Sequence, residues 1–94
     1  MYKEFPDVPD FGAFSGLSLE MDPSVTKEST MYVYKSTKTA LINDYKKLLE
    51  ENGFKFSHEA EISGGNVFAY YKKGSAIVAI GIAFDLYTAV VVFH

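Results

Sequence analysis

A histidine and three carboxylates are the residues of this sequence that could carry out acid–base chemistry. His58 is followed by Glu59 and Glu61, and Asp85 comes later in the chain. A histidine held beside a carboxylate is a common arrangement for proton transfer or for binding a metal ion. On a strand, however, His58 and Glu59 would point to opposite faces. A hydrolase would need at least two of the four side chains to converge in one cleft.

Glu59 and Glu61 share one face of the expected strand, and nothing in the sequence would raise the pKa of either carboxyl group. We interpret them as solvated side chains and His58 as a partly buried one. We therefore assign no catalytic residue and no metal ligand.

Nucleophile and phosphate-binding motifs are incomplete. Gly16-Leu17-Ser18-Leu19-Glu20 lacks the closing glycine of a nucleophile elbow. Ser63-Gly64-Gly65-Asn66 lacks the lysine and the following helix of a phosphate loop, and instead predicts a turn. The chain has no cysteine, which excludes disulfides and thiolate chemistry. No cofactor site is predicted.

Composition excludes two classes of partner. The net charge is −3 and the nine basic residues are spread along the chain, whereas nucleic-acid affinity depends on clustered Lys and Arg. No apolar run approaches the roughly 20 residues of a membrane-spanning helix. With 48% hydrophobic and 16% aromatic residues, the chain is too apolar for a disordered protein. We expect a folded protein with no nucleic-acid partner and no membrane insertion.

The residues that follow the first strands have the spacing of an amphipathic helix, predicted over 37–52. Apolar side chains recur there every three or four positions, as in Leu41, Tyr45 and Leu48. Ser36 or Thr37 could cap its N-terminus, and Gly53 can adopt the left-handed conformation that ends it.

The remaining patterns predict strands around this helix. Residues 16–21 and 30–35 would form two strands before it, and residues 54–93 would form a four-stranded antiparallel meander after it. Residues 1–15, rich in Pro and Phe, predict an extended arm without a regular helix. The expected fold is a single α+β domain over 1–94. In it, one helix packs on a mainly antiparallel sheet of five or six strands in the order ββαββββ.

The last two strands, 76–84 and 87–93, are apolar on both sides, as expected of a sheet covered on both faces. One helix covers only one face. The small residues Ala79, Gly81 and Ala83 would suit close approach of that helix, so that Val78, Ile80 and Ile82 would face a second cover. Three covers are possible: the N-terminal arm, a second copy of the protein, or another partner or apolar ligand.

These patterns favour a non-enzymatic binding or assembly module that uses an apolar sheet face, as a homo-oligomer or with a protein partner. The alternative is a small-ligand carrier or sensor built from the tyrosines and the arm, and a hydrolase is the third hypothesis. Tyr32 and Tyr34 are also typical of ordinary sheet packing. The candidate interface or ligand residues are Phe11, Phe14, Tyr32, Tyr34, Tyr70, Val78, Ile80 and Ile82.

The segment from Asp44 to Phe54, with its Tyr-Lys motif and its Asn52-Gly53-Phe54 exit, resembles small bacterial α+β domains of uncharacterised function. Those domains have a Pro-rich N-terminal segment, a hairpin, a helix that ends in Gly-Phe or Gly-Trp, and a β meander. They often belong to secreted proteins or lipoproteins. Because the N-terminus here has no apolar signal region, the chain is either cytoplasmic or had its signal sequence removed. The resemblance favours the extracytoplasmic alternative and transfers no catalytic residue.

Overall fold

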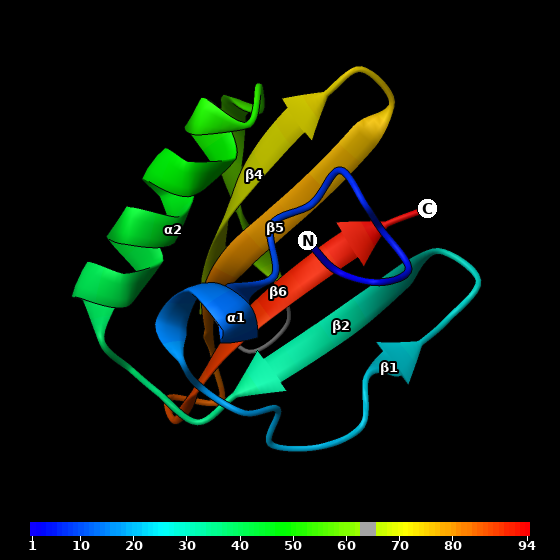
Figure 1. The fold of residues 1–94 in the computed structure, drawn as a ribbon. Coiled ribbons are helices and arrows are strands. Elements are labelled where there is room, and N and C mark those ends of the chain that lie inside the picture. Colours follow the sequence, from blue (N-terminus) through cyan, green and yellow to red (C-terminus); the bar gives the residue numbers. More distant parts are fainter. Residues whose placement is uncertain (63–65) are drawn as a thin grey trace.

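Six antiparallel strands form one twisted sheet in the computed structural model, which describes residues 1–62 and 66–94 (Figure 1). The strand order is β1-β2-β6-β5-β4-β3. The α+β fold and the order ββαββββ are confirmed, with one additional short helix. The elements are α1 (Phe11–Ser15), β1 (Ser24–Val25), β2 (Ser29–Tyr34), α2 (Thr39–Glu51), β3 (Lys55–Ile62), β4 (Asn66–Lys73), β5 (Ala76–Ala83) and β6 (Tyr87–Phe93).

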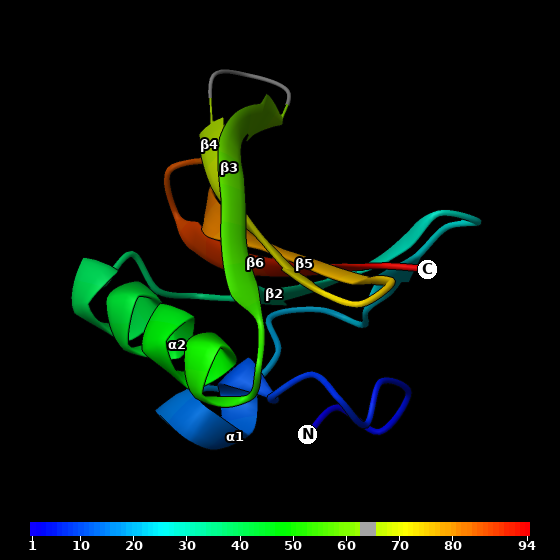
Figure 2. The ribbon, with the colours of Figure 1, turned by 90° about the horizontal axis from the view of Figure 1, so that it is seen from above.

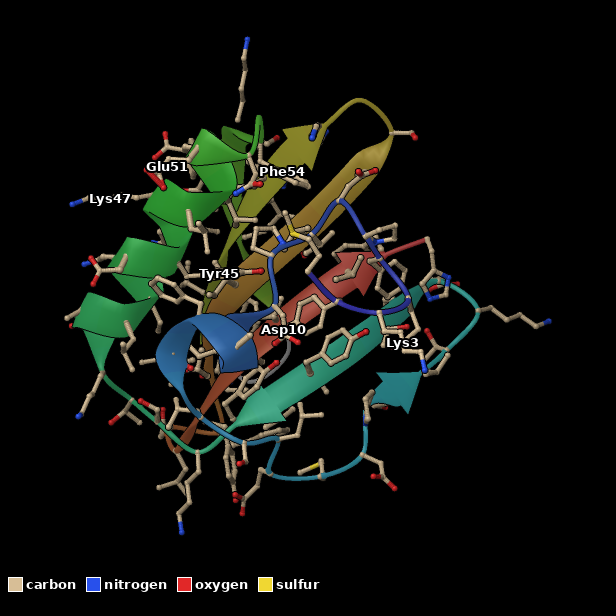
Figure 3. The ribbon with its side chains drawn as sticks, viewed as in Figure 1. Lys3, Asp10, Tyr45, Lys47, Glu51 and Phe54 are labelled. Atoms are coloured by element: carbon tan, nitrogen blue, oxygen red, sulfur yellow. The ribbon has the colours of Figure 1, made fainter. Side chains whose placement is uncertain are left out.

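The helix α2 buries the apolar side predicted from its spacing. Ile42, Tyr45 and Leu49 are buried, and Tyr45 points inward while Lys47 and Glu51 point away from the sheet (Figure 3). The predicted cap is wrong: Lys38 occupies the N-cap, and no side chain caps the helix. Gly53 follows the helix with φ 91°, the left-handed conformation expected of it.

The arm is not fully extended, which corrects the prediction. Asp10 caps α1, and its side chain accepts a hydrogen bond from the Ala13 N–H. Gly16 ends the helix with φ 79°. The prolines that argued against a helix precede α1 rather than interrupt it.

The arm packs on the same side of the sheet as α2, and not on the opposite side (Figure 2). Tyr2, Val8 and Phe11 share one core with Tyr45 of α2. The Tyr2 and Tyr34 hydroxyl groups are hydrogen-bonded at 2.7 Å, and the Tyr45 hydroxyl donates to the Pro9 carbonyl at 2.6 Å. The hypothesis that the arm covers the other side is therefore wrong. We call the side that carries α2 and the arm the helix face, and the opposite side the second face.

The orientation of β5 is the reverse of the prediction. Val78 and Ile80 pack in the helix-face core, whereas Ala79 and Ala83 belong to the cluster on the second face. The small residues accommodate the sheet's own side chains rather than α2. A Cβ atom on Gly81 would lie 2.9 Å from Phe68 Cδ1, so the ring of Phe68 takes the place of a side chain there.

Two strand boundaries also differ from the predictions. Within 16–21 only Leu19 makes a bridge, to Tyr34, and the first strand is the two-residue β1. In β3 the register shifts between Phe56 and His58, because a β-bulge inserts one unpaired residue and reverses the alternation after it. Phe56 and His58, predicted on one face, therefore lie on opposite faces. Of the turn predicted at Ser63-Gly64-Gly65-Asn66, residues 63–65 lie outside the described residues, and Asn66 begins β4.

Candidate binding face

The strand register defines which side chains form the second face. Directly paired residues of neighbouring strands point to the same side of a sheet, so the register sorts the face into three rows that run across the strands. The first row is Lys55, Lys72, Ile77, Phe93 and Ser29; the second is His58, Tyr70, Ala79, Val91 and Met31; the third is Ala60, Phe68, Gly81, Ala89 and Val33.

The middle of the second face is apolar and built from small side chains. Ala79 and Ala89 are fully buried, and Phe68 and Val91 are almost so. Met31, Tyr70 and Phe93 pack around them and remain half-buried. Both helices and the arm lie on the helix face (Figure 2), so the outer surface of these half-buried side chains faces solvent.

Three aromatic rings form a stack across this face. His58 lies parallel to Tyr70, with ring centroids 4.7 Å apart and an interplanar angle of 10°. Tyr70 in turn stacks with Phe93 at 5.7 Å and 23°. Tyr70 and Phe93 belong to β4 and β6, which are separated by β5. Their rings meet above β5 on a diagonal between two rows, where Tyr70 is paired with the small residue Ala79 and Phe93 with Ile77.

Two hollows flank the Tyr70–Phe93 pair, and both rings line each hollow. The first, about 260 Å³, is completed by His58, Lys72 and Ile77. The second, about 270 Å³, is completed by the following residues of β1, β2, β6 and the β1–β2 turn: Ser24, Thr26, Ser29, Met31 and Val91. An aromatic ridge between two shallow apolar hollows is a shape that can accept side chains from another molecule.

The edges of the sheet are less suited to binding than its face. At one edge β1 has only two residues. At the other edge β3 carries a bulge and the charged residues Lys55, Glu59 and Glu61. Short strands, bulges and charges are the features that prevent a strand from pairing with another chain.

Most of the residues predicted for a binding site lie elsewhere. Phe11, Tyr32, Tyr34, Val78 and Ile80 are buried in the helix-face core, and Ile82 is packed against it. Phe14 is 40% exposed on α1. Of the eight residues only Tyr70 lies on the second face. The structure adds Met31, Ile77, Val91, Phe93 and His58. Ile77, Val91 and Phe93 belong to the strands predicted to be apolar on both sides, whereas nothing in the sequence pointed to Met31 or His58 as binding residues.

The tyrosines of the helix face serve as anchors for the arm. Burial raises the pKa of the Tyr34 hydroxyl to about 12. It also raises the pKa of Tyr32 to about 12, with a further contribution from the hydrogen bond of Tyr32 to Glu4. Burial raises the pKa values of Tyr2 and Tyr45 further still. These hydroxyl groups stay protonated at neutral pH and are already engaged within the fold.

The acid–base candidates are divided between the two faces. Glu59 and Asp85 line a cleft of about 370 Å³ between α2 and the sheet, together with Lys46. His58 lies on the second face, and Glu61 is not part of this cleft. The two carboxylates therefore share a cleft without the histidine that would be their proton-transfer partner.

Within the described ranges, no three His, Asp or Glu side chains gather into a group that could hold a metal ion. In the same part of the chain, neither helix has the length and hydrophobicity needed to cross a membrane.

Comparisons with family models, with curated proteins and with solved structures found no match to this chain.

Proposed function

We propose that this protein is a non-enzymatic binding module whose second face docks a segment of another polypeptide. The observation that carries the proposal is an apolar sheet face, with an aromatic ridge and two hollows, that lies opposite both helices and the arm (Figure 2). The largest apolar patch on the surface of a monomeric protein is often functional, and patches larger than a few hundred Å² usually mark interaction sites.

The size of the face supports a peptide-like segment as the occupant. Strands of seven or eight residues at about 3.3 Å per residue, with strands about 4.8 Å apart, make the five-strand face roughly 500 Å². A standard protein–protein interface buries about 800 Å² on each partner, and obligate dimers bury more. An extended or helical segment fits the smaller area.

Displacement of water would supply the affinity. A hollow of about 260 Å³ has room for roughly eight waters at their liquid volume. Removing apolar surface from water contributes about 25 cal/mol per Å². Met31, Ile77 and Phe93, all half-buried, would gain this contribution on binding, and truncating one of them would remove part of it.

The test is a selection from a random peptide-display library against the immobilised protein, followed by anisotropy titrations of the enriched peptides. Met31→Glu introduces a charge in the second hollow of this face and should weaken binding about tenfold or more, equivalent to about 1.4 kcal/mol. Phe56→Glu is the matched control, because Phe56 is 53% exposed on the same sheet and lies on the helix face. Thermal melts of both variants would confirm that they are folded.

Three results would contradict the proposal. The library could enrich no peptide, or the enriched peptides could bind the wild type and Met31→Glu equally. Light scattering could also show a dimer that Met31→Glu dissociates, which would make a second copy the occupant.

A second candidate is a small-ligand carrier or sensor. A cleft of about 320 Å³ lies between the arm and β2, lined by Tyr2, Tyr32 and Tyr34 among others. All three hydroxyl groups are hydrogen-bonded inside the protein, which leaves few groups to orient a ligand. Chemical-shift changes at these tyrosines in a screen of small aromatic compounds would favour this function over the first.

A further inference from the structure

We infer that the docked segment carries a carboxylate, which binds at a basic corner of the second face beside the aromatic stack. This inference rests on the function proposed above and adds the chemistry of the partner. The basic corner consists of Lys55, Lys72 and His58, all exposed.

The register brings these three residues together from β3 and β4. Lys55 pairs directly with Lys72, and His58 pairs with Tyr70 in the next row. Like charges directly opposite each other on one face of a sheet are destabilising. The Lys55–Lys72 pair therefore does not strengthen the hairpin and is better explained by a ligand of opposite charge.

The paired strand positions that define the second face carry no acidic side chain. None of the fifteen residues in its three rows is Asp or Glu. Glu59 pairs with Ala69, which belongs to the helix-face core. The chain as a whole has a net charge of −3. The charge of the basic corner is therefore opposite in sign to the net charge of the protein.

The basic corner borders the first hollow, so charge and apolar contact would act on the same ligand. Lys72 and His58 line this hollow together with Tyr70, Ile77 and Phe93. An apolar or aromatic side chain of the partner would fill the hollow, and a neighbouring Asp or Glu would reach Lys72. Exposed ion pairs contribute only about 0.2–1 kcal/mol, so the apolar side chain provides most of the affinity and the charge provides selectivity and a faster encounter.

A second copy of this chain fits the second face less well than an acidic segment. In a two-fold dimer the same surface of the two copies is in contact. Each basic corner would then face the second face of the other copy, whose three rows contain no carboxylate. The estimated area of roughly 500 Å² is also below the roughly 800 Å² per partner of a standard interface.

The test compares two library selections, one on the wild type and one on the double variant Lys55→Glu/Lys72→Glu. Peptides selected on the wild type should contain Asp or Glu next to an aromatic or large aliphatic residue. Peptides selected on the double variant should contain Lys or Arg instead. The wild-type peptides should bind the double variant about tenfold more weakly at low salt, and the difference should shrink near 1 M salt, where charges are screened beyond about 3 Å.

The matched control is Lys38→Glu/Lys47→Glu, which makes the same change in charge at two exposed positions, the N-cap and the interior of α2, on the helix face. Binding of the wild-type peptides to this variant should be almost unchanged. Peptides that depend on Met31 but show no acidic bias and no response to charge reversal would overturn this inference and leave the proposed function standing. The absence of any peptide that depends on Met31 would overturn both.

Discussion

The hydroxyl group of Tyr2 is the connection that makes the arm part of the helix-face core. Tyr2 is 4% exposed. Its oxygen is hydrogen-bonded to the Tyr34 hydroxyl at 2.7 Å and accepts a hydrogen bond from the Phe11 N–H at 3.2 Å. The substitution Tyr2→Phe removes this oxygen and keeps the ring, which stacks on Tyr32 with centroids 4.0 Å apart. The variant therefore isolates the two hydrogen bonds.

The expected loss follows from burial. Phe11 is fully buried, and leaving a buried N–H without its acceptor costs about 1–3 kcal/mol. We expect Tyr2→Phe to lower the free energy of unfolding by about 2 kcal/mol, which corresponds to a Tm lower by roughly 8–16 °C for a domain of this size.

The measurement is urea denaturation followed by circular dichroism, with Tyr70→Phe as the matched control. The Tyr70 hydroxyl makes no hydrogen bond to any side chain or backbone group in residues 1–62 and 66–94, and a substitution there should change stability by less than about 0.5 kcal/mol. Equal stabilities for the two variants would refute the reasoning. The two hydrogen bonds of the Tyr2 hydroxyl would then contribute little to stability, and the apolar packing of Tyr2, Val8 and Phe11 would hold the arm on the helix face.

Three further outcomes are expected. Because the pKa of Tyr34 is raised from 10.0 to about 12, the stability this residue contributes should be complete below pH 10 and lost between pH 10 and 12; urea midpoints that stay constant over that range would contradict this. Gly81→Ala should destabilise the fold by about 1–3 kcal/mol, since its Cβ would lie 2.7 Å from the Val67 carbonyl oxygen; an unchanged Tm would argue against this close contact. Phe84→Asn with Asp85→Gly should raise the Tm by roughly 4–8 °C, because both positions have positive φ, 55° and 58°, which Asn and Gly adopt at lower cost; a lower Tm would mean that the turn is not strained.

The helix and the strands after it were predictable because their signals are local. The spacing of Tyr45 and Leu49 indicates a helix with one buried side, and Gly53 indicates where the helix ends. The alternation of polar and apolar residues likewise reports a strand. The bulge in β3 was not predictable in this way, because an inserted residue such as Ser57 leaves no local mark and changes the face of every residue after it.

The candidate site was only partly predictable. Tyr70 was correctly placed among residues of a sheet, but its position opposite α2 depends on contacts between distant strands. Met31 and Phe93 are brought into the same hollow by β2 and β6, which are more than fifty residues apart in the chain. No short-range pattern connects them.

By itself, the sequence determined that β5 and β6 are apolar on both sides and that one long helix is present to cover them. Only the tertiary structure decided which side that helix covers. Alternation with a period of two sorts the residues of a strand into two faces. It does not say which face lies under the helix, so Val78 and Ala79 are equally good candidates for that position. The choice was made by packing. The large side chains of β5 fill the space beneath α2 and the arm, and Gly81 and Ala79 leave room on the second face for Phe68 and for the Tyr70–Phe93 ridge.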